Sequence, residues 1–145
     1  MEVCTIGFTK RTAADFFGTL SARGIRRLVD VRLNNSSQLA GFSKREDLRF
    51  FLHELCGAEY IHEPLLAPTP ELFAAYRKRR GTWEAHEDGF FRLMAERRVE
   101  TRLNRGLFET AAVLLCSEPT AGRCHRRLVL EYLQRNWGEL TMVHL

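Results

Sequence analysis

Two cysteines and the residues beside them are the part of this sequence best suited to chemistry. In LLCSEPTAGRCHRRL, residues 114–128, Cys116 ends an apolar run, and Cys124 is followed directly by His125 and Arg126. Free amides and the positive dipole end of a helix N-terminus, together with arginine, favour an anion. The same field lowers the pKa of a thiol at that position. Cys124 is therefore a candidate thiolate, and Cys116 is the alternative nucleophile, with His125 and Arg126 beside it.

The spacing of this segment argues against one familiar chemistry. Phosphatases that use a cysteine place an arginine six positions after it, whereas here that position is Gly122, and Arg123 comes one residue later. One residue matters because all the loop amides must point at a single anion. The spacing supports an anion pocket without phosphatase chemistry. The structural alternative stays open: Cys116 is a buried small apolar residue, and the arginines are solvated or paired.

A zinc site is a third interpretation of the same residues. Cys116, Cys124 and His125 could supply three ligands, but the sequence has no CxxC pair, and neighbouring residues seldom both reach one ion. We therefore predict no cofactor, with zinc disfavoured but still open.

The elements that position these residues follow from the apolar pattern. Short apolar runs predict strands. Segments with helical periodicity, caps at Thr12, Ser43 and Thr69, and terminal glycines predict helices between them. The strands are expected at 4–8, 27–32, 58–64, 110–116 and 140–145, and the helices at 12–24, 43–57, 69–81, 82–104 and 124–138. Such alternation predicts one α/β domain over residues 1–145, with three layers and a mostly parallel sheet of about five strands covered by helices.

Ligands of open parallel sheets bind at the carboxyl ends of the strands, so the residues after each apolar run are candidates. Asp30 is a candidate acid or base, although a partly buried carboxylate is commonly paired with an arginine such as Arg32. His62 is interpreted as a packed, hydrogen-bonded histidine. The predicted anion-binding residues at this edge are Arg32, Arg126, Thr9, Lys10 and Glu118.

The composition excludes several classes of protein. The chain has 145 residues, of which 45% are hydrophobic and 28% charged, which is typical of a globular domain. It has no apolar run long enough to cross a bilayer and no secretory signal pattern, so we expect a cytoplasmic protein with reduced thiols and no membrane partner. The sequence does not predict the oligomeric state.

Arginine supplies all but three of the 22 basic residues, and the net charge is +4. The basic run at 77–80, flanked by Tyr76 and Trp83, and the arginines of 97–105 could follow phosphates and stack on bases. A basic helix end is also explained by the helix dipole alone, so nucleic-acid binding is only weakly indicated.

Five motifs, TIGFTKR, LVDVR, GFSK, YIHEPLLAP and LLCSEPTAGRCHRRL, together resemble the widespread prokaryotic family catalogued as domain of unknown function 488. The resemblance implies an α/β domain and no established reaction. The positions that carry it are Asp30, Arg32, Phe42, Ser43, Lys44, Cys116, Glu118, Cys124, His125 and Arg126. Many relatives have His-Ser where this chain has Phe8 and Thr9, which leaves no base at position 8, and many have Leu-Gly-Gly where this chain reads Leu66, Ala67 and Pro68.

Two hypotheses of function remain. The first is a small cysteine-dependent enzyme of unknown reaction, whose pocket at the strand ends binds an anionic small molecule through the residues above. The second is a non-catalytic module that binds a nucleotide or nucleic acid through the same arginine-rich edge.

Overall fold

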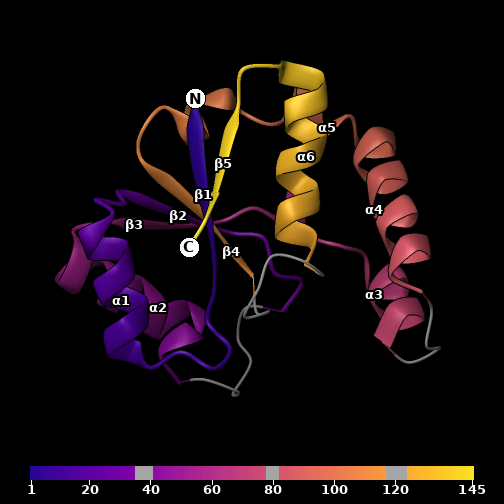
Figure 1. Ribbon diagram of the computed structural model, residues 1–145. Helices are drawn as coiled ribbons and strands as arrows, with labels where there is room; N and C mark the ends of the chain where they lie inside the picture. The colour runs from indigo at the N-terminus through magenta and orange to yellow at the C-terminus, as the bar shows by residue number, and fades with distance from the viewer. Residues whose placement is uncertain (35–40, 78–81, 117–123) are drawn as a thin grey trace.

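A computed structural model describes residues 1–34, 41–77, 82–116 and 124–145 (Figure 1). Its strands are β1 (Glu2–Gly7), β2 (Arg27–Asp30), β3 (Glu59–His62), β4 (Ala112–Cys116) and β5 (Thr141–His144). The α-helices are α1 (Ala13–Ala22), α2 (Arg45–Phe51), α3 (Pro70–Arg77), α4 (Trp83–Arg97), α5 (Val99–Arg102) and α6 (His125–Trp137). A π-helix, Leu52–Cys56, continues α2, and 3-10 turns occupy Gly41–Ser43, Pro64–Leu66 and Arg105–Phe108.

The five strands form one sheet in the order β3-β2-β4-β1-β5, and every pair of neighbours is parallel. All five residues of β4 are buried, as expected for a central strand of a sheet covered on both faces. The predicted three-layer α/β architecture is confirmed, and the sheet is entirely parallel.

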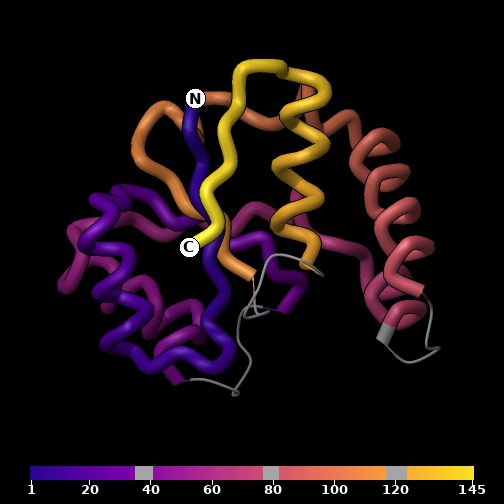
Figure 2. The backbone as a smooth tube through the Cα atoms, in the orientation of Figure 1, coloured from indigo at the N-terminus to yellow at the C-terminus, as the bar shows by residue number. Residues whose placement is uncertain are grey.

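Helices cover the two faces of the sheet separately, α1 and α2 on one and α3 to α6 on the other (Figures 1 and 2). Side chains alternate between the faces of a strand, so each strand contributes to two cores. Residues Cys4, Ile6, Leu28, Val113 and Leu115 pack with Phe16, Leu20 and Leu48 beneath α1 and α2. Residues Val3, Val29, Ala112 and Leu114 pack with Phe90, Met94, Leu128 and Leu133 beneath α4 and α6.

Two of the three predicted helix caps are confirmed. The hydroxyl of Thr12 accepts a hydrogen bond from the amide of Asp15 at 3.1 Å, and that of Thr69 accepts one from Leu72 at 3.1 Å. The predicted cap at Ser43 is wrong. Ser43 belongs to a 3-10 turn, its carbonyl accepts a bond from Arg32, and the helix follows Lys44, which makes no side-chain cap.

Two predicted helices are also shorter than expected. The segment predicted as one helix over 82–104 is divided, because Arg98 adopts a left-handed conformation (φ 53°) between α4 and α5. The helix predicted over 43–57 changes from α to π geometry at Leu52 before it ends at Gly57, whose φ is 60°. Neither change of backbone geometry has a signature in the apolar pattern.

The strand order places the end of β4 at a topological switch point. The connection after β1 passes through α1 on one face, whereas the connection after β4 passes through α6 on the other, in the opposite direction along the sheet. β1 and β4 are neighbours, with Gly7 opposite Cys116. In open α/β sheets the crevice between two such strands is where ligands bind. Cys116 therefore lies at the favoured edge of this fold.

Candidate functional site

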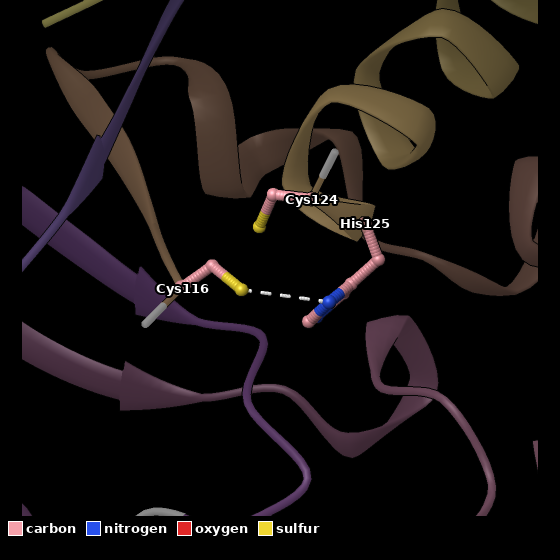
Figure 3. A group of neighbouring side chains, drawn as sticks. All are labelled: Cys116, Cys124 and His125. Atoms are coloured by element: carbon pink, nitrogen blue, oxygen red, sulfur yellow. Dashed lines mark hydrogen bonds between the residues drawn. The ribbon is translucent and has the colours of Figure 1, made fainter. Parts of the chain in front are cut away.

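The end of β4 and the start of α6 bring three chemically active side chains together. Cys116 is the last residue of β4, Cys124 is the N-cap of α6, and His125 is the first residue of that helix. Their two sulfurs and a ring nitrogen of His125 all lie within 4.8 Å of one another (Figure 3). The sheet pleat explains this contact, because Cys116 shares its face with Ala112 and Leu114, which pack beneath α6. We call these residues the thiol cluster.

The imidazole of His125 is held between Cys116 and a backbone carbonyl. Its Nδ1 lies 3.5 Å from Cys116 Sγ, and its Nε2 lies 2.6 Å from the carbonyl oxygen of Val31. Because a carbonyl only accepts hydrogen bonds, Nε2 carries a hydrogen and donates it to Val31. Nδ1 is thereby directed at the sulfur, where it can take or return the thiol proton. A thiol, a base and a group that orients the base form the arrangement of an activated nucleophile.

The pKa values of the two thiols in the cluster shift in opposite directions. Burial alone would raise the pKa of Cys116, but a hydrogen bond from Cys124 and the charges of His125 and Arg126 lower it well below the ordinary thiol value. Burial and the neighbouring Cys116 raise the pKa of Cys124. Burial lowers the pKa of His125, yet the charge and hydrogen bond of Cys116 raise it overall. These shifts favour Cys116 over Cys124 as the candidate thiolate, a choice that the sequence left open.

Arg126 adds a buried positive charge to the thiol cluster. It is 1% exposed, and its Nη1 lies 3.7 Å from Cys124 Sγ. Cys116 and Cys124 are 3% and 2% exposed, whereas His125 is only partly buried. A reagent that reaches the sulfurs must therefore be small.

Asp30 and Arg32 form a second polar cluster at the same edge of the sheet. Arg32 donates from Nε to Asp30 Oδ1 at 2.9 Å and from Nη2 to Oδ2 at 2.8 Å. The Tyr60 hydroxyl donates to Oδ2 at 2.6 Å, and Arg32 Nη2 also donates to the carbonyl of Ser43 at 2.7 Å. Arg32 lies over the ring of Phe8, whose side chain belongs to the core beneath α1 and α2. We call this set the carboxylate cluster.

The two clusters therefore lie on opposite faces of the sheet. The predicted acid or base Asp30 already accepts bonds from Arg32 and Tyr60, the contacts of a structural ion pair, and its catalytic role stays a prediction. Within the described part of the chain, Arg32 Nη1 is buried without a hydrogen-bond partner. Anion binding by Arg32 is likewise untested.

The other residues predicted at this edge of the sheet are Thr9, Lys10, Glu118 and His62. Thr9 and Lys10 follow β1 at the predicted edge, where Thr9 is partly buried and Lys10 is exposed with a left-handed backbone (φ 64°). Glu118 lies outside the described residues. His62 donates from Nε2 to the carbonyl of Arg32 at 3.1 Å, which agrees with its interpretation as a hydrogen-bonded residue.

Sequence reasoning missed two groups that orient the candidate residues. The Val31 carbonyl is a backbone atom and has no sequence signature. The contact of Tyr60 with Asp30 depends on the register of β3 against β2, in which Tyr60 lies opposite Leu28. The local sequence does not determine that register.

The basic segments give no added support to nucleic-acid binding. Residues 78–80 of the first run lie outside the described residues, and the rings of Tyr76 and Trp83 pack against each other with centroids 5.7 Å apart. In the second segment, Arg97 donates to the carbonyls of Leu65 and Ala67. These contacts give Arg97 a structural role at the turn before α3.

A zinc ion would find three ligands in the thiol cluster. Cys116, Cys124 and His125 place their ligand atoms within 4.8 Å of one another, although adjacent residues seldom both reach one ion, and the zinc site stays an untested alternative. The Val31 carbonyl orients His125 as outer-shell groups orient zinc ligands. Against zinc, the guanidinium of Arg126 lies beside Cys124 and would repel a dication.

A hollow of about 390 Å³ lies on the other face of the sheet, between α1 and the π-helix. Its lining is mostly apolar and includes Phe17, Phe51 and Leu55. This lining does not suit an anion, and the anion pocket expected at the strand ends stays a prediction.

The match of this chain to a family model covers residues 12–133 and therefore includes both clusters. The chain belongs to the DUF488 family. That family is described as a domain of unknown function, so membership confirms the resemblance read from the five motifs and assigns no reaction. No curated protein and no solved structure matches the chain. No helix of the described DUF488 chain is long and apolar enough to cross a membrane.

Proposed function

We propose that this DUF488 protein is a thiol-dependent enzyme in which Cys116 is the nucleophile and His125 its acid and base. The observation that carries the proposal is the chain of contacts from Cys116 Sγ through His125 to the Val31 carbonyl. Arg126 and the first amides of α6 favour a substrate whose reacting group is, or becomes, negatively charged.

The reaction begins with the proton of Cys116 already on His125 Nδ1. The thiolate attacks an electrophilic atom of the substrate and forms a covalent bond with it. The imidazolium then gives its proton to the leaving group, while Arg126 and the helix dipole stabilise the negative charge that develops there. The Val31 carbonyl keeps the ring in the tautomer that makes both transfers possible.

The test is the alkylation rate of each cysteine by a haloacetamide as a function of pH, with the modified residue identified by mass spectrometry. Cys56 is the internal control, because it lies in the π-helix and burial raises its pKa. At pH 7 we expect Cys116 to react roughly tenfold faster than Cys56, although Cys56 is the more exposed. Added sulfate should slow Cys116 and leave Cys56 unchanged.

An unreactive Cys116 in the folded protein would contradict the proposal. Unreactive thiols combined with salt-dependent binding of oligonucleotides would instead favour the non-catalytic nucleic-acid module. If Cys116 is alkylated fast and sulfate does not slow the reaction, Cys116 remains the proposed nucleophile, but the proposal of a negatively charged substrate group is contradicted.

A further inference from the structure

The second thiol of the cluster has no role in the proposed reaction. Cys124 lies beside Cys116, and the two sulfurs point toward each other. The ring of His125 lies next to both sulfurs (Figure 3). Both cysteines have fixed backbones, because Cys116 ends a fully buried strand and Cys124 caps a helix that packs on the core. The two sulfurs lie within 4.8 Å of each other, and a disulfide would bring them to about 2 Å.

We propose that the thiol cluster reduces small hydroperoxides, with Cys116 as the thiol that is oxidised and Cys124 as the thiol that resolves it into a disulfide. This inference rests on the proposed function in one respect, the nucleophilic Cys116, and adds a substrate class and a second catalytic residue. Burial of both sulfurs selects a small oxidant, and a hydroperoxide is a small molecule whose leaving oxygen becomes an anion.

In the first step the Cys116 thiolate attacks the terminal oxygen of ROOH. An S–O bond forms and the O–O bond breaks, and His125 gives its proton to the leaving alkoxide, so that a sulfenic acid and ROH result. The sulfur is oxidised by two electrons and the peroxide is reduced by two. Arg126, which is buried with its Nη1 3.7 Å from Cys124 Sγ, stabilises the departing alkoxide.

In the second step Cys124 attacks the sulfenic sulfur of Cys116. The S–S bond forms, the thiol proton of Cys124 and the hydroxyl of the sulfenic acid leave as water, and the sulfurs reach the disulfide state. A dithiol reductant then returns both cysteines to thiols and is itself oxidised to a disulfide. The cycle consumes one hydroperoxide and one dithiol and leaves the protein unchanged.

The experiment treats the reduced protein with one equivalent of hydrogen peroxide, blocks the remaining thiols and digests the chain with trypsin. Cleavage after Arg123 separates the two cysteines, so a disulfide between them joins the peptide that ends at Arg123 to the peptide that begins at Cys124. We expect this linked pair, its loss with dithiothreitol, and free thiols at Cys4 and Cys56. The metal content of the same sample is measured beforehand.

Two variants separate the roles of the sulfurs. In Cys124→Ser the sulfenic acid of Cys116 should persist and be trapped by dimedone, whereas Cys116→Ser should consume peroxide no faster than the reagent blank. Cys56→Ser is the matched control and should form the disulfide at the wild-type rate. Because the main readout uses the wild-type chain, a variant that fails to fold does not decide the test.

Each result supports or overturns the inference. The linked peptides in the wild type, with dimedone capture in Cys124→Ser, support it. Fast alkylation of Cys116 without peroxide-driven disulfide formation overturns it and leaves the proposed function standing, whereas slow alkylation and no disulfide overturn both. Stoichiometric zinc that blocks both reactions until a chelator removes it, with no disulfide afterwards, assigns the cluster to a metal site and overturns the peroxide cycle.

Discussion

The carboxylate cluster and the thiol cluster lie at the same edge of one sheet, yet they differ in how their charges are satisfied. The Asp30 carboxylate receives fixed hydrogen bonds from Arg32 and Tyr60, although Arg32 Nη1 has no hydrogen-bond partner among the described residues. In the thiol cluster His125 Nδ1 lies 3.5 Å from Cys116 Sγ, and Arg126 supplies a buried positive charge beside Cys124. A paired carboxylate holds a structure in place, whereas a thiol in contact with an imidazole beside a buried positive charge suits proton transfer.

A substitution that breaks the carboxylate cluster should lower the stability of the protein most. Asp30→Ala should lower the free energy of unfolding by about 3–5 kcal/mol, because it leaves Arg32 buried without its counter-charge. Urea unfolding followed by circular dichroism measures this loss. Glu59→Ala is the matched control, since it removes the partly exposed partner of Arg27 and should cost at most about 1 kcal/mol. Equal losses in the two variants would show that Asp30 has no special structural role.

A smaller effect is expected when one donor to Asp30 is removed. Tyr60→Phe retains the buried ring but removes the hydroxyl that donates to Oδ2 at 2.6 Å, and it should cost about 1.5–3 kcal/mol of unfolding free energy. The alkylation rate of Cys116 should stay at the wild-type value, because Tyr60 packs on the opposite face of the sheet. A change in that rate would mean that the two clusters are coupled.

A substitution in the thiol cluster should have the smallest effect, and it concerns the reactivity of Cys116. His125→Gln should return the pKa of Cys116 toward the ordinary value, so that most of the thiolate at pH 7 is lost. A less acidic thiol is intrinsically more nucleophilic, which partly offsets this loss, and we expect roughly tenfold slower alkylation at pH 7. The variant and the wild type should converge above pH 9 or so, where both thiols are ionised.

His53→Gln is the matched control for that substitution, because the side chain of His53 is 80% exposed and lies on the π-helix, away from the thiol cluster. It should leave the pH profile of Cys116 unchanged. If His125→Gln alkylates at the wild-type rate at every pH, the imidazole does not activate the thiol.

The sequence predicted the alternation of strands and helices because each element has its own apolar periodicity. It also predicted that Asp30, Arg32 and Cys116 would lie at one edge, since the carboxyl ends of parallel strands meet there. The face that each side chain occupies follows from the pleat and the register, and Asp30 lies opposite Leu115, the neighbour of Cys116, so the two candidates are on opposite faces. The local pattern does not contain that register.

The sequence could not choose between Cys116 and Cys124 as the reactive thiol for a related reason. Sequence reasoning placed Cys124 at the helix start, where a dipole lowers a thiol pKa. The contact of His125 with Cys116 is tertiary, since the packing of α6 against β4 creates it, and the local sequence does not show it.

A nitrogen NMR titration of the His125 ring shows whether Cys116 and His125 form the proposed thiolate–imidazolium pair at neutral pH. Because Cys116 raises the pKa of His125, the ring should remain doubly protonated at pH values where an ordinary histidine, with a pKa of about 6.5, is neutral. In Cys116→Ala the same ring should lose its proton at lower pH. A His125 that is neutral at pH 7 in the wild type, with hydrogen on Nε2 alone, would contradict the account.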